Sequence, residues 1–282
     1  MTYCEALRQG GQLLREHGIL DAKQDAWLLL SRACGIDRNF YYMHMRDEIE
    51  NERQKEYESL LSMRAKRIPL QHITGEQEFM GLSFLVNAHV LIPRQDTEIL
   101  VEEALKRAKP DMDVLDLCTG SGCIAVSLCA HMERIHAVAS DISRKALEIA
   151  RENAKRHAAD VRFVKSDLFS EITGQFDLIV SNPPYIPTGE IEALMPEVRD
   201  FEPRLALDGD ADGLVFYRSI IKESGHYLKS GGFLMFEIGF DQGAGVSGLM
   251  RDAGFEKIEI VKDLAGLDRV VAGEKRELCL TN

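Results

Sequence analysis

Short apolar runs and amphipathic segments alternate from residue 113 onward, and this alternation restricts the chain to few folds. The apolar runs have the length of buried strands, and the segments between them have helical spacing. Such alternation predicts a doubly wound, mostly parallel α/β sheet with helices on its faces. The predicted strands are 114–117, 137–140, 161–164, 178–180, 233–238, 257–261 and 269–273. The predicted helices are 124–130, 144–155, 213–227 and 246–253.

The part of the chain before this alternation has a different pattern. Residues 1–73 carry apolar residues at helical spacing without strand signals, which predicts a small α-helical bundle. Residues 74–92 are predicted to form a β-hairpin linker, with strands around Phe84 and Val90. A helix over 99–108 follows, with Thr97 as its predicted N-cap. The third predicted domain covers 93–282.

Charge and composition exclude several classes of protein. The chain has 282 residues and a net charge of −12. Residues 1–75 are balanced, with 11 basic and 11 acidic side chains, so the whole deficit lies in 76–282. An acidic C-terminal part is a poor match for a phosphate backbone, and direct nucleic-acid binding is not expected. No apolar run approaches the ~18 residues of a membrane span, and no signal peptide begins the chain, which predicts a cytoplasmic protein.

The six cysteines do not form a C-x-x-C pair or group with histidines. A zinc site or a disulfide framework is therefore not expected, and no metal is predicted. Nothing in the pattern demands more than a monomer.

The segment that follows the predicted strand 178–180 reads Asn182, Pro183, Pro184 and Tyr185. Two prolines cannot continue a central strand and hold the chain extended. The carboxyl end of a strand is where ligands bind in open α/β sheets. Asn182 offers an amide carbonyl and the prolines offer backbone carbonyls, so fixed acceptors lie close together. This arrangement suits a planar NH2 group, and Tyr185 adds a flat face.

A glycine loop follows the first strand of the sheet and ends in Gly120 and Gly122. Glycines there permit a tight turn and close approach of a ligand to the backbone. Asp116 at the start of this loop would repel a pyrophosphate but would accept hydrogen bonds from an ammonium group. S-adenosylmethionine has an ammonium and a sulfonium and carries no phosphate, so it is the predicted cofactor.

Two further acidic side chains end the next two strands. Asp141 can accept both hydroxyls of a ribose, or it can cap the next helix, a role that Ser143 could also fill. Asp167 can accept from an adenine amino group while Leu168 packs on the ring. The predicted cofactor-binding residues are Asp116, Cys118, Thr119, Gly120, Ser121, Gly122, Asp141, Asp167, Leu168 and Asn182.

These two motifs together resemble class I, Rossmann-like, S-adenosylmethionine-dependent methyltransferases that act on an amide or an exocyclic amine. The segment 91–98, Leu-Ile-Pro-Arg-Gln-Asp-Thr-Glu, and the segment 202–207, Glu-Pro-Arg-Leu-Ala-Leu, resemble the HemK/PrmC family more specifically. The resemblance covers nearly the whole chain. It implies an antiparallel strand at the C-terminal end of the sheet and an N-terminal domain that docks class 1 peptide chain release factors.

The resemblance also implies an activity: methylation of the side-chain N5 of the glutamine in the Gly-Gly-Gln motif of those release factors. Asn182, Pro183 and Tyr185 are the predicted catalytic residues, and Pro184 joins them in binding substrate. The Asn182 side-chain oxygen and the Pro183 carbonyl would accept the two amide hydrogens, and Tyr185 would pack on the glutamine. The alternative is a nucleic-acid methyltransferase acting on adenine N6 or guanine N2, which shares the Asn-Pro-Pro-Tyr motif.

The chain departs from the family pattern at three positions. Gln95 replaces a proline, Cys118 replaces a glycine and His72 replaces a tyrosine. Cys118 is expected to adopt an ordinary backbone conformation. The roles of Arg94, Glu202 and Arg204 stay open between loop architecture and contact with ligands.

Overall fold

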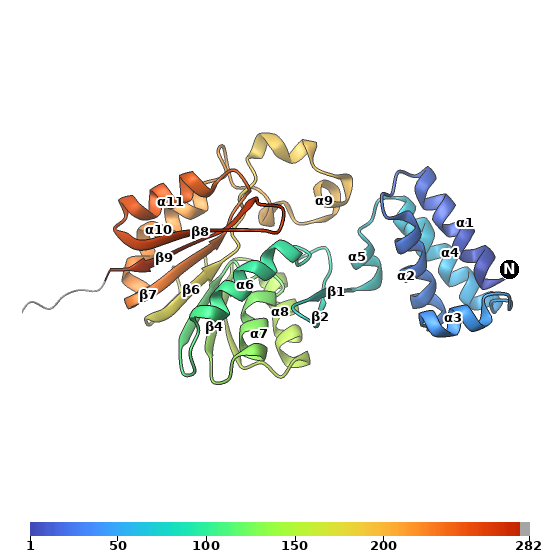
Figure 1. Ribbon diagram of the computed structural model, residues 1–282, viewed down its shortest axis with the longest axis horizontal. Helices are drawn as coiled ribbons and strands as arrows, with labels where there is room; N and C mark the ends of the chain where they lie inside the picture. The colour runs from blue at the N-terminus through green and yellow to red at the C-terminus, as the bar shows by residue number, and fades with distance from the viewer. Residues whose placement is uncertain (277–282) are drawn as a thin grey trace, which may run out of the picture. The chain divides into compact units, whose positions relative to one another are not determined.

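A computed structural model describes residues 1–276, and Cys279 lies outside the described residues. The chain divides into two compact units (Figure 1). Unit 1 comprises residues 1–76 and 195–201, and unit 2 comprises residues 77–194 together with the chain from 202 onward. Within residues 1–276, no helix is long and apolar enough to cross a membrane.

Unit 1 is helical. Its helices are α1 (Tyr3–Glu16), α2 (Ala22–Cys34), α3 (Arg38–His44), α4 (Asn51–Ala65), α5 (Leu70–Thr74) and α9 (Pro196–Phe201). Residues of the first five helices pack into one apolar core. Thr2 and Glu5 form a capping box that starts α1. Gly10 lets α4 approach α1, because a Cβ on Gly10 would lie 2.1 Å from the Tyr57 hydroxyl.

A two-stranded sheet stands where unit 1 passes into unit 2 along the chain, and it is made of β1 (Glu76–Phe79) and β2 (Leu82–Leu85). Met80 and Gly81, which join these strands, both have positive φ, as a tight two-residue hairpin turn requires. The predicted second strand around Val90 is wrong. Val86 and Val90 instead form an irregular segment that packs against Ala146.

The main sheet has seven strands in the order β5-β4-β3-β6-β7-β9-β8. Its strands are β3 (Asp113–Leu117), β4 (His136–Asp141), β5 (Val161–Lys165), β6 (Phe176–Ser181), β7 (Leu228–Glu237), β8 (Phe255–Lys262) and β9 (Asp268–Lys275). The first five run parallel, while β9 is antiparallel to both β7 and β8. The predicted doubly wound sheet with a C-terminal antiparallel strand is confirmed.

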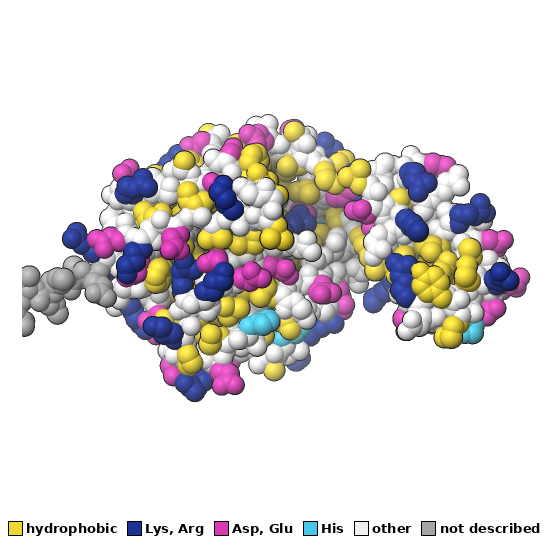
Figure 2. Space-filling view, in the orientation of Figure 1, with side chains coloured by type: hydrophobic (Ala, Val, Ile, Leu, Met, Phe, Trp, Pro, Cys, Tyr) yellow, Lys and Arg dark blue, Asp and Glu magenta, His cyan; other side chains and the backbone are white. Residues whose placement is uncertain are grey.

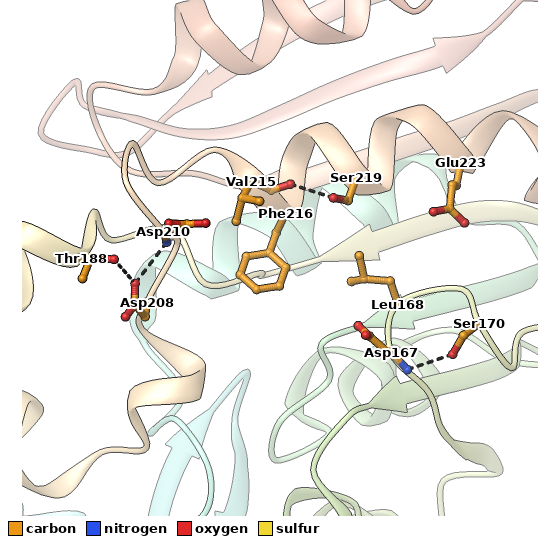
Figure 3. Close-up of a pocket in the computed structure, with 10 residues that line it drawn as sticks. All are labelled: Asp167, Leu168, Ser170, Thr188, Asp208, Asp210, Val215, Phe216, Ser219 and Glu223. Atoms are coloured by element: carbon orange, nitrogen blue, oxygen red, sulfur yellow. Dashed lines mark hydrogen bonds between the residues drawn. The ribbon is translucent and has the colours of Figure 1, made fainter.

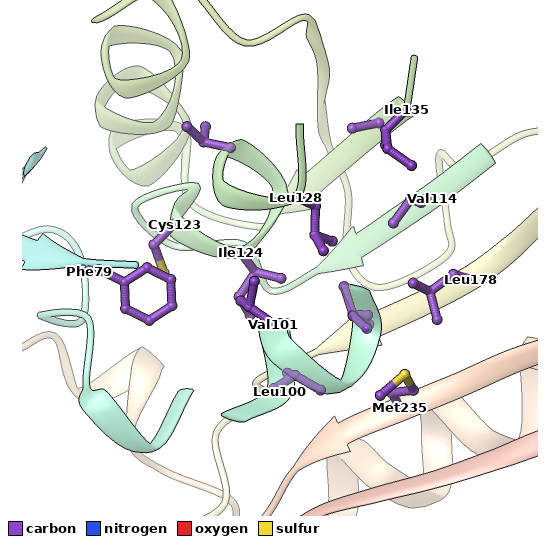
Figure 4. Packing of buried hydrophobic residues seen from close by; sticks show 14 of the residues in the cluster. Phe79, Leu100, Val101, Val114, Cys123, Ile124, Leu128, Ile135, Leu178 and Met235 are labelled. Atoms are coloured by element: carbon purple, nitrogen blue, oxygen red, sulfur yellow. The ribbon is translucent and has the colours of Figure 1, made fainter. Parts of the chain in front are cut away.

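Helices cover both faces of this sheet (Figure 1). They are α6 (Gln95–Arg107), α7 (Cys123–His131), α8 (Arg144–Arg156), α10 (Val215–Tyr227) and α11 (Gly243–Asp252). Alternate residues of each strand point to opposite faces, so Val114 joins the core under α6 and α7 whereas Leu115 joins the core under α10 and α11. Figure 4 shows the first of these cores, in which Leu100 and Ile124 pack against strand residues.

The strand order reverses between β3 and β6, and this reversal fixes where a ligand can bind. Leu117 and Ser181, the last residues of these two strands, are paired in register. The Ser181 hydroxyl also donates to the Leu117 carbonyl at 2.8 Å. The loops that follow both strands therefore leave the same edge side by side, at a topological switch point.

The connection after β6 is long and mostly irregular. It contains two short 3-10 turns, η1 (Thr188–Ala193) and η2 (Arg204–Ala206), and α9 lies between them. The covalent chain thus leaves unit 2, contributes α9 to unit 1 and returns at Glu202.

Candidate active site

A cavity of about 370 Å³ opens at the switch point of the sheet in unit 2. Nine of the predicted site residues line it: Cys118, Thr119, Gly120, Ser121, Asp141, Asp167, Leu168, Asn182 and Pro184. They come from the ends of four neighbouring strands, so the register of the sheet brings them together. The side chains described as lining this cavity include no Lys or Arg. Such a lining suits a cationic ligand and offers no charge partner to a phosphate.

Asp116 does not line the cavity: it is completely buried and contacts Thr119, which does line it. Its Oδ2 accepts hydrogen bonds from the Thr119 hydroxyl at 2.6 Å and from the Ala125 N–H at 3.2 Å. Its Oδ1 has no hydrogen-bond partner within residues 1–276. Burial raises the pKa of this carboxyl to about 7. A buried acceptor without a partner is what an ammonium group, directly or through water, would satisfy.

The glycine loop leaves room for a ligand. Gly120 has a φ of +55°, and a Cβ built on it would meet nothing within 4 Å. Gly122 has a φ of +81° and begins α7, and a Cβ there would lie 3.0 Å from the Ala150 Cβ. Gly122 therefore permits α7 to pack on α8, whereas Gly120 forms part of the cavity wall and leaves space beside it.

Cys118 contradicts the expected ordinary backbone conformation, because its φ is +59°. Cys118 is the first residue after β3, and its backbone lies in the left-handed region of φ and ψ, which favours glycine. The chain accepts a β-carbon there, and burial raises the pKa of the thiol, so Cys118 behaves as a small apolar group at the cavity wall.

Asp141 holds the glycine loop as well as lining the cavity. Its Oδ2 accepts from the Gly120 N–H at 2.9 Å and its Oδ1 accepts from the Ser143 N–H at 2.8 Å. Ser143 is the N-cap of α8, with its hydroxyl accepting from the Ala146 N–H at 3.2 Å. The carboxylate is thus not used as a helix cap, and each oxygen keeps a second lone pair for a ligand hydroxyl.

The 182–185 segment divides between the cavity and the interior. Asn182 and Pro184 line the cavity, while Pro183 is buried. Tyr185 is partly buried against the core under α10 and α11, and its hydroxyl donates to Glu237 Oε1 at 3.4 Å. Within residues 1–276, the Asn182 side chain forms one hydrogen bond: its Nδ2 donates to Thr97 Oγ1 at 3.2 Å. Its Oδ1 is left for a ligand.

Thr97 was predicted as a helix cap, and this prediction is wrong. Helix α6 begins at Gln95 with Arg94 as its N-cap, so Thr97 lies within the first turn and is buried. The arginine also forms an ion pair with Glu202, whose Oε2 accepts from the Ile92 N–H at 3.3 Å. Burial raises the pKa of Glu202, and Arg94 opposes that rise. Both residues support the loop that carries Pro203, Leu205 and Ala206 to the cavity.

Several lining residues were not among the predicted site residues. Ile142 directly follows Asp141 and is 45% exposed, and Phe216 comes from the first turn of α10. An exposed isoleucine next to an acidic strand end is a signal that could have identified Ile142. Nothing local distinguishes Phe216 from an ordinary helix residue.

A second, shallower pocket shares Asp167, Leu168 and Phe216 with this cavity (Figure 3). Its other lining residues include Asp208, Asp210 and Glu223. In Figure 3, Asp208 accepts from the Thr188 hydroxyl, which holds the loop before α10. The second pocket, which adjoins the cavity, is therefore acidic as well.

The sheet order and the cavity define a class I methyltransferase. A solved methyltransferase from Pyrococcus furiosus has the same fold, with a TM-score of 0.52 and 19% identity over 70% of this chain and 90% of that one. Residues 5–75 match the PrmC N-terminal domain family, and residues 94–197 match the methyltransferase small domain family.

Two curated relatives specify the family. The release factor glutamine methyltransferase of Geobacter sulfurreducens is 47% identical over 261 residues, which is 92% of each chain. The release factor glutamine methyltransferase of Cereibacter sphaeroides is 42% identical over 274 residues, covering 96% of this chain and 98% of that one. The chain belongs to the release factor glutamine methyltransferase family.

Proposed function

We propose that this protein transfers a methyl group from S-adenosylmethionine to the side-chain N5 of the glutamine in the Gly-Gly-Gln motif of class 1 peptide chain release factors. The observation that supports this most directly is Asn182, which lines the cavity and keeps its Oδ1 free of hydrogen bonds to residues 1–276. An amide oxygen fixed in that place accepts a hydrogen bond from a planar NH2 group.

The residues around the cavity fit the cofactor. Asp116 Oδ1 would receive its ammonium group, Asp141 would accept its ribose hydroxyls, and Asp167 with Leu168 and Ile142 would hold its adenine. When bound, the cofactor supplies an electrophilic methyl group on a sulfonium. Cys118, Thr119, Gly120, Ser121 and Gly122 would shape the loop that encloses it.

The glutamine amide is a poor nucleophile, because its nitrogen lone pair is delocalised into the carbonyl. In our proposal Asn182 Oδ1 and the Pro183 carbonyl accept the two N–H hydrogens of this amide. These contacts increase electron density on nitrogen and fix its direction. Pro184 and the exposed part of Tyr185 confine the glutamine side chain. Positioning and preorganised dipoles would supply the acceleration, without a general base.

The helical N-terminal domain, residues 1–73, is proposed to dock the release factor, with 74–92 as linker and 93–282 as the methyltransferase domain. The nucleic-acid alternative is disfavoured by charge. The second pocket, which shares Asp167 with the cavity, is also lined by Asp208, Asp210 and Glu223. Acidic and basic side chains are interspersed over the face in Figure 2 rather than gathered into a basic surface.

The test is transfer of labelled methyl from S-adenosylmethionine to a purified class 1 release factor. The matched control is a release factor whose Gly-Gly-Gln glutamine is replaced by alanine, and total RNA and DNA are assayed in parallel. Label on the release factor and none on its variant is expected. Label only on nucleic acid, or equal label on both release factors, would contradict the proposal.

A further inference from the structure

The side chain of Thr97 lies directly behind the proposed catalytic amide. Thr97 is 2% exposed and sits in the first turn of α6, where the backbone needs no cap from it. Its hydroxyl oxygen accepts the hydrogen bond from Asn182 Nδ2 at 3.2 Å. This is a contact between residues 85 apart in the sequence. The hydroxyl is therefore available to orient Asn182.

Glu237 lies beside the same pair. It is the last residue of β7, and because Ser181 pairs with Phe236, Asn182 and Glu237 leave adjacent strands at the same level. Glu237 is 2% exposed, and its Oε2 has no hydrogen-bond partner in the part of the chain that is described. Its Oε1 accepts from the Tyr185 hydroxyl at 3.4 Å.

Thr97 also acts on Glu237. Burial raises the pKa of the Glu237 carboxyl to about 7, and the nearby Thr97 hydroxyl is the largest of the influences that lower it. The Thr97 hydroxyl thus lies near the Glu237 carboxyl, and it also accepts the hydrogen bond from the Asn182 amide.

The hydrogen-bonding capacity of a hydroxyl makes this arrangement directional. Threonine has one hydrogen to donate and two lone pairs to accept with. Glu237 Oε2 is a buried oxygen without a partner in the described residues, and when Glu237 is ionised it can only accept. A Thr97 hydroxyl that turns its hydrogen toward this oxygen keeps only lone pairs for Asn182. The NH2 end of the amide must then face Thr97, and the Oδ1 end must face away from it. The two ends of an asparagine amide are nearly equal in size, so shape alone does not select between them.

We propose that Thr97 and Glu237 are positioning residues that lock the Asn182 amide with Oδ1 toward the substrate amide. This inference rests on the proposed function. A flipped amide would present NH2 to the NH2 of the substrate, so two donors would face each other and the acceptor needed for methyl transfer would be lost. Tyr185, through its hydrogen bond to Glu237, connects the far end of the 182–185 segment to the same carboxylate.

The experiment compares Thr97→Val with Thr97→Ser. Valine keeps the shape of threonine and removes the hydroxyl, whereas serine keeps the hydroxyl. We expect Thr97→Val to lower kcat for release-factor methylation by about tenfold or more, with KM for both substrates changed less than about threefold. Thr97→Ser should restore kcat to within about threefold of the wild type. Thr173→Val, at an exposed position in the irregular segment before β6, is the control and should leave kcat unchanged.

Glu237→Gln provides a second, independent variant of nearly equal size. Glutamine can direct its own NH2 toward Thr97, which frees the hydroxyl hydrogen for Asn182 Oδ1 and so favours the wrong orientation. We expect kcat to fall while S-adenosylmethionine affinity, measured by calorimetry, stays within about threefold. If Thr97→Val does not fold, Glu237→Gln decides the question with the same assays.

The outcomes separate the two proposals. A wild-type protein that leaves the release-factor glutamine unmethylated contradicts the proposed function. An active wild type whose Thr97→Val and Glu237→Gln variants keep the wild-type kcat contradicts the positioning role alone. A Thr97→Ser variant as slow as Thr97→Val also overturns it, because the hydroxyl would then not be the cause.

Discussion

Gly213 packs directly against the backbone carbonyl of Tyr185: a Cβ built on Gly213 would lie 2.3 Å from that oxygen. The glycine also has a φ of +72°, which disfavours any side chain. The Tyr185 carbonyl accepts a hydrogen bond from Gln242 Nε2 at 2.9 Å. Gly209 approaches Tyr185 from the same loop, with a Cβ position 2.8 Å from the Tyr185 Cα. The loop before α10 therefore clamps the end of the 182–185 segment.

Gly213→Ala should displace this segment. We expect a loss of about 3 kcal/mol in the free energy of unfolding, because strain at positive φ adds to a backbone clash. Methyl transfer should fall more than stability alone explains, since the misplaced segment carries the proposed acceptors. Chemical denaturation and steady-state kinetics measure the two effects.

The control for this substitution is Gly248→Ala. Gly248 lies within α11 and a Cβ there meets nothing within 4 Å. Alanine is favoured over glycine in a helix, so stability should stay the same or rise by about 0.5–1 kcal/mol. Equal losses in the two variants would show that the contact with Tyr185 has no special effect.

Asn182→Ala removes the proposed acceptor. We expect kcat to fall by about 10²- to 10³-fold, as for loss of a preorganised polar contact in other active sites. Because Asn182 donates its one side-chain hydrogen bond to Thr97 and is only partly buried, the fold should persist. Single-turnover methylation and circular dichroism measure these properties, and unchanged turnover in a folded variant would refute the role assigned to Asn182.

The sequence predicted the sheet well where apolar runs end at turn residues. Strand 178–180 lies inside β6 and strand 114–117 inside β3, so the positions after them were predictable too. Strand β7 begins five residues earlier than predicted, at Leu228, because Gly231 and Gly232 resemble a turn but lie within the strand. Local pattern does not show that a partner strand continues past two glycines.

The site was predictable only where its residues follow strand ends. Asp141 and Asn182 were identified by that position, whereas the roles of Thr97 and Glu237 depend on contacts between distant segments. The positive φ of Cys118 was missed for a related reason: the loop geometry is imposed by the ligand-facing turn and is adopted even without glycine.

Asp116 should make stability depend on pH. Its pKa in the folded protein, about 7, lies above its ordinary value of 3.8, because the carboxyl is buried. Between these values the folded state keeps a proton that the unfolded state releases, so the free energy of unfolding falls as pH rises through this range. Below pH 3.8 the group has no effect, and above pH 7 its destabilising effect is complete.

Asp116→Asn removes this titration. We expect the stability of the variant relative to the wild type to increase by a few kcal/mol between about pH 4 and pH 8, measured by urea denaturation without cofactor. Glu237, whose pKa is also raised to about 7 by burial, remains in both proteins and cancels in the comparison. A difference that does not change with pH would show that Asp116 does not titrate in this range.

A buried ion network in unit 1 links α2, α4 and α9. Arg64 bonds Asp25 at 2.7 Å and Glu197 at 3.0 Å, and Arg67 bonds Glu197 at 2.6 Å. The side chains of Asp25, Arg64 and Glu197 are at most 10% exposed. Removing one member of such a network leaves a buried charge without its partner, which costs about 3 kcal/mol or more.

Arg64→Met should therefore destabilise unit 1 by about 3 kcal/mol. Trp27 is the single tryptophan of the chain and is buried in this unit, so its fluorescence during urea unfolding reports on unit 1. Arg53→Met is the control on the same helix, since Arg53 pairs with Glu56 and both side chains are about half exposed. Its cost should stay below about 1 kcal/mol.

Glu197→Gln tests whether the loop after the 182–185 segment stabilises the N-terminal helices. Glu197 is 133 residues beyond Arg64 and is carried by α9 in the connection that follows β6. Glutamine keeps the size of glutamate but removes the charge that two arginines share. The free energy of unfolding measured by Trp27 fluorescence should therefore fall by about 2–3 kcal/mol, and the urea midpoint should decrease. A transition at the wild-type midpoint would mean that α9 adds no stability to this unit, and the loss in Arg64→Met would then come from Asp25 alone.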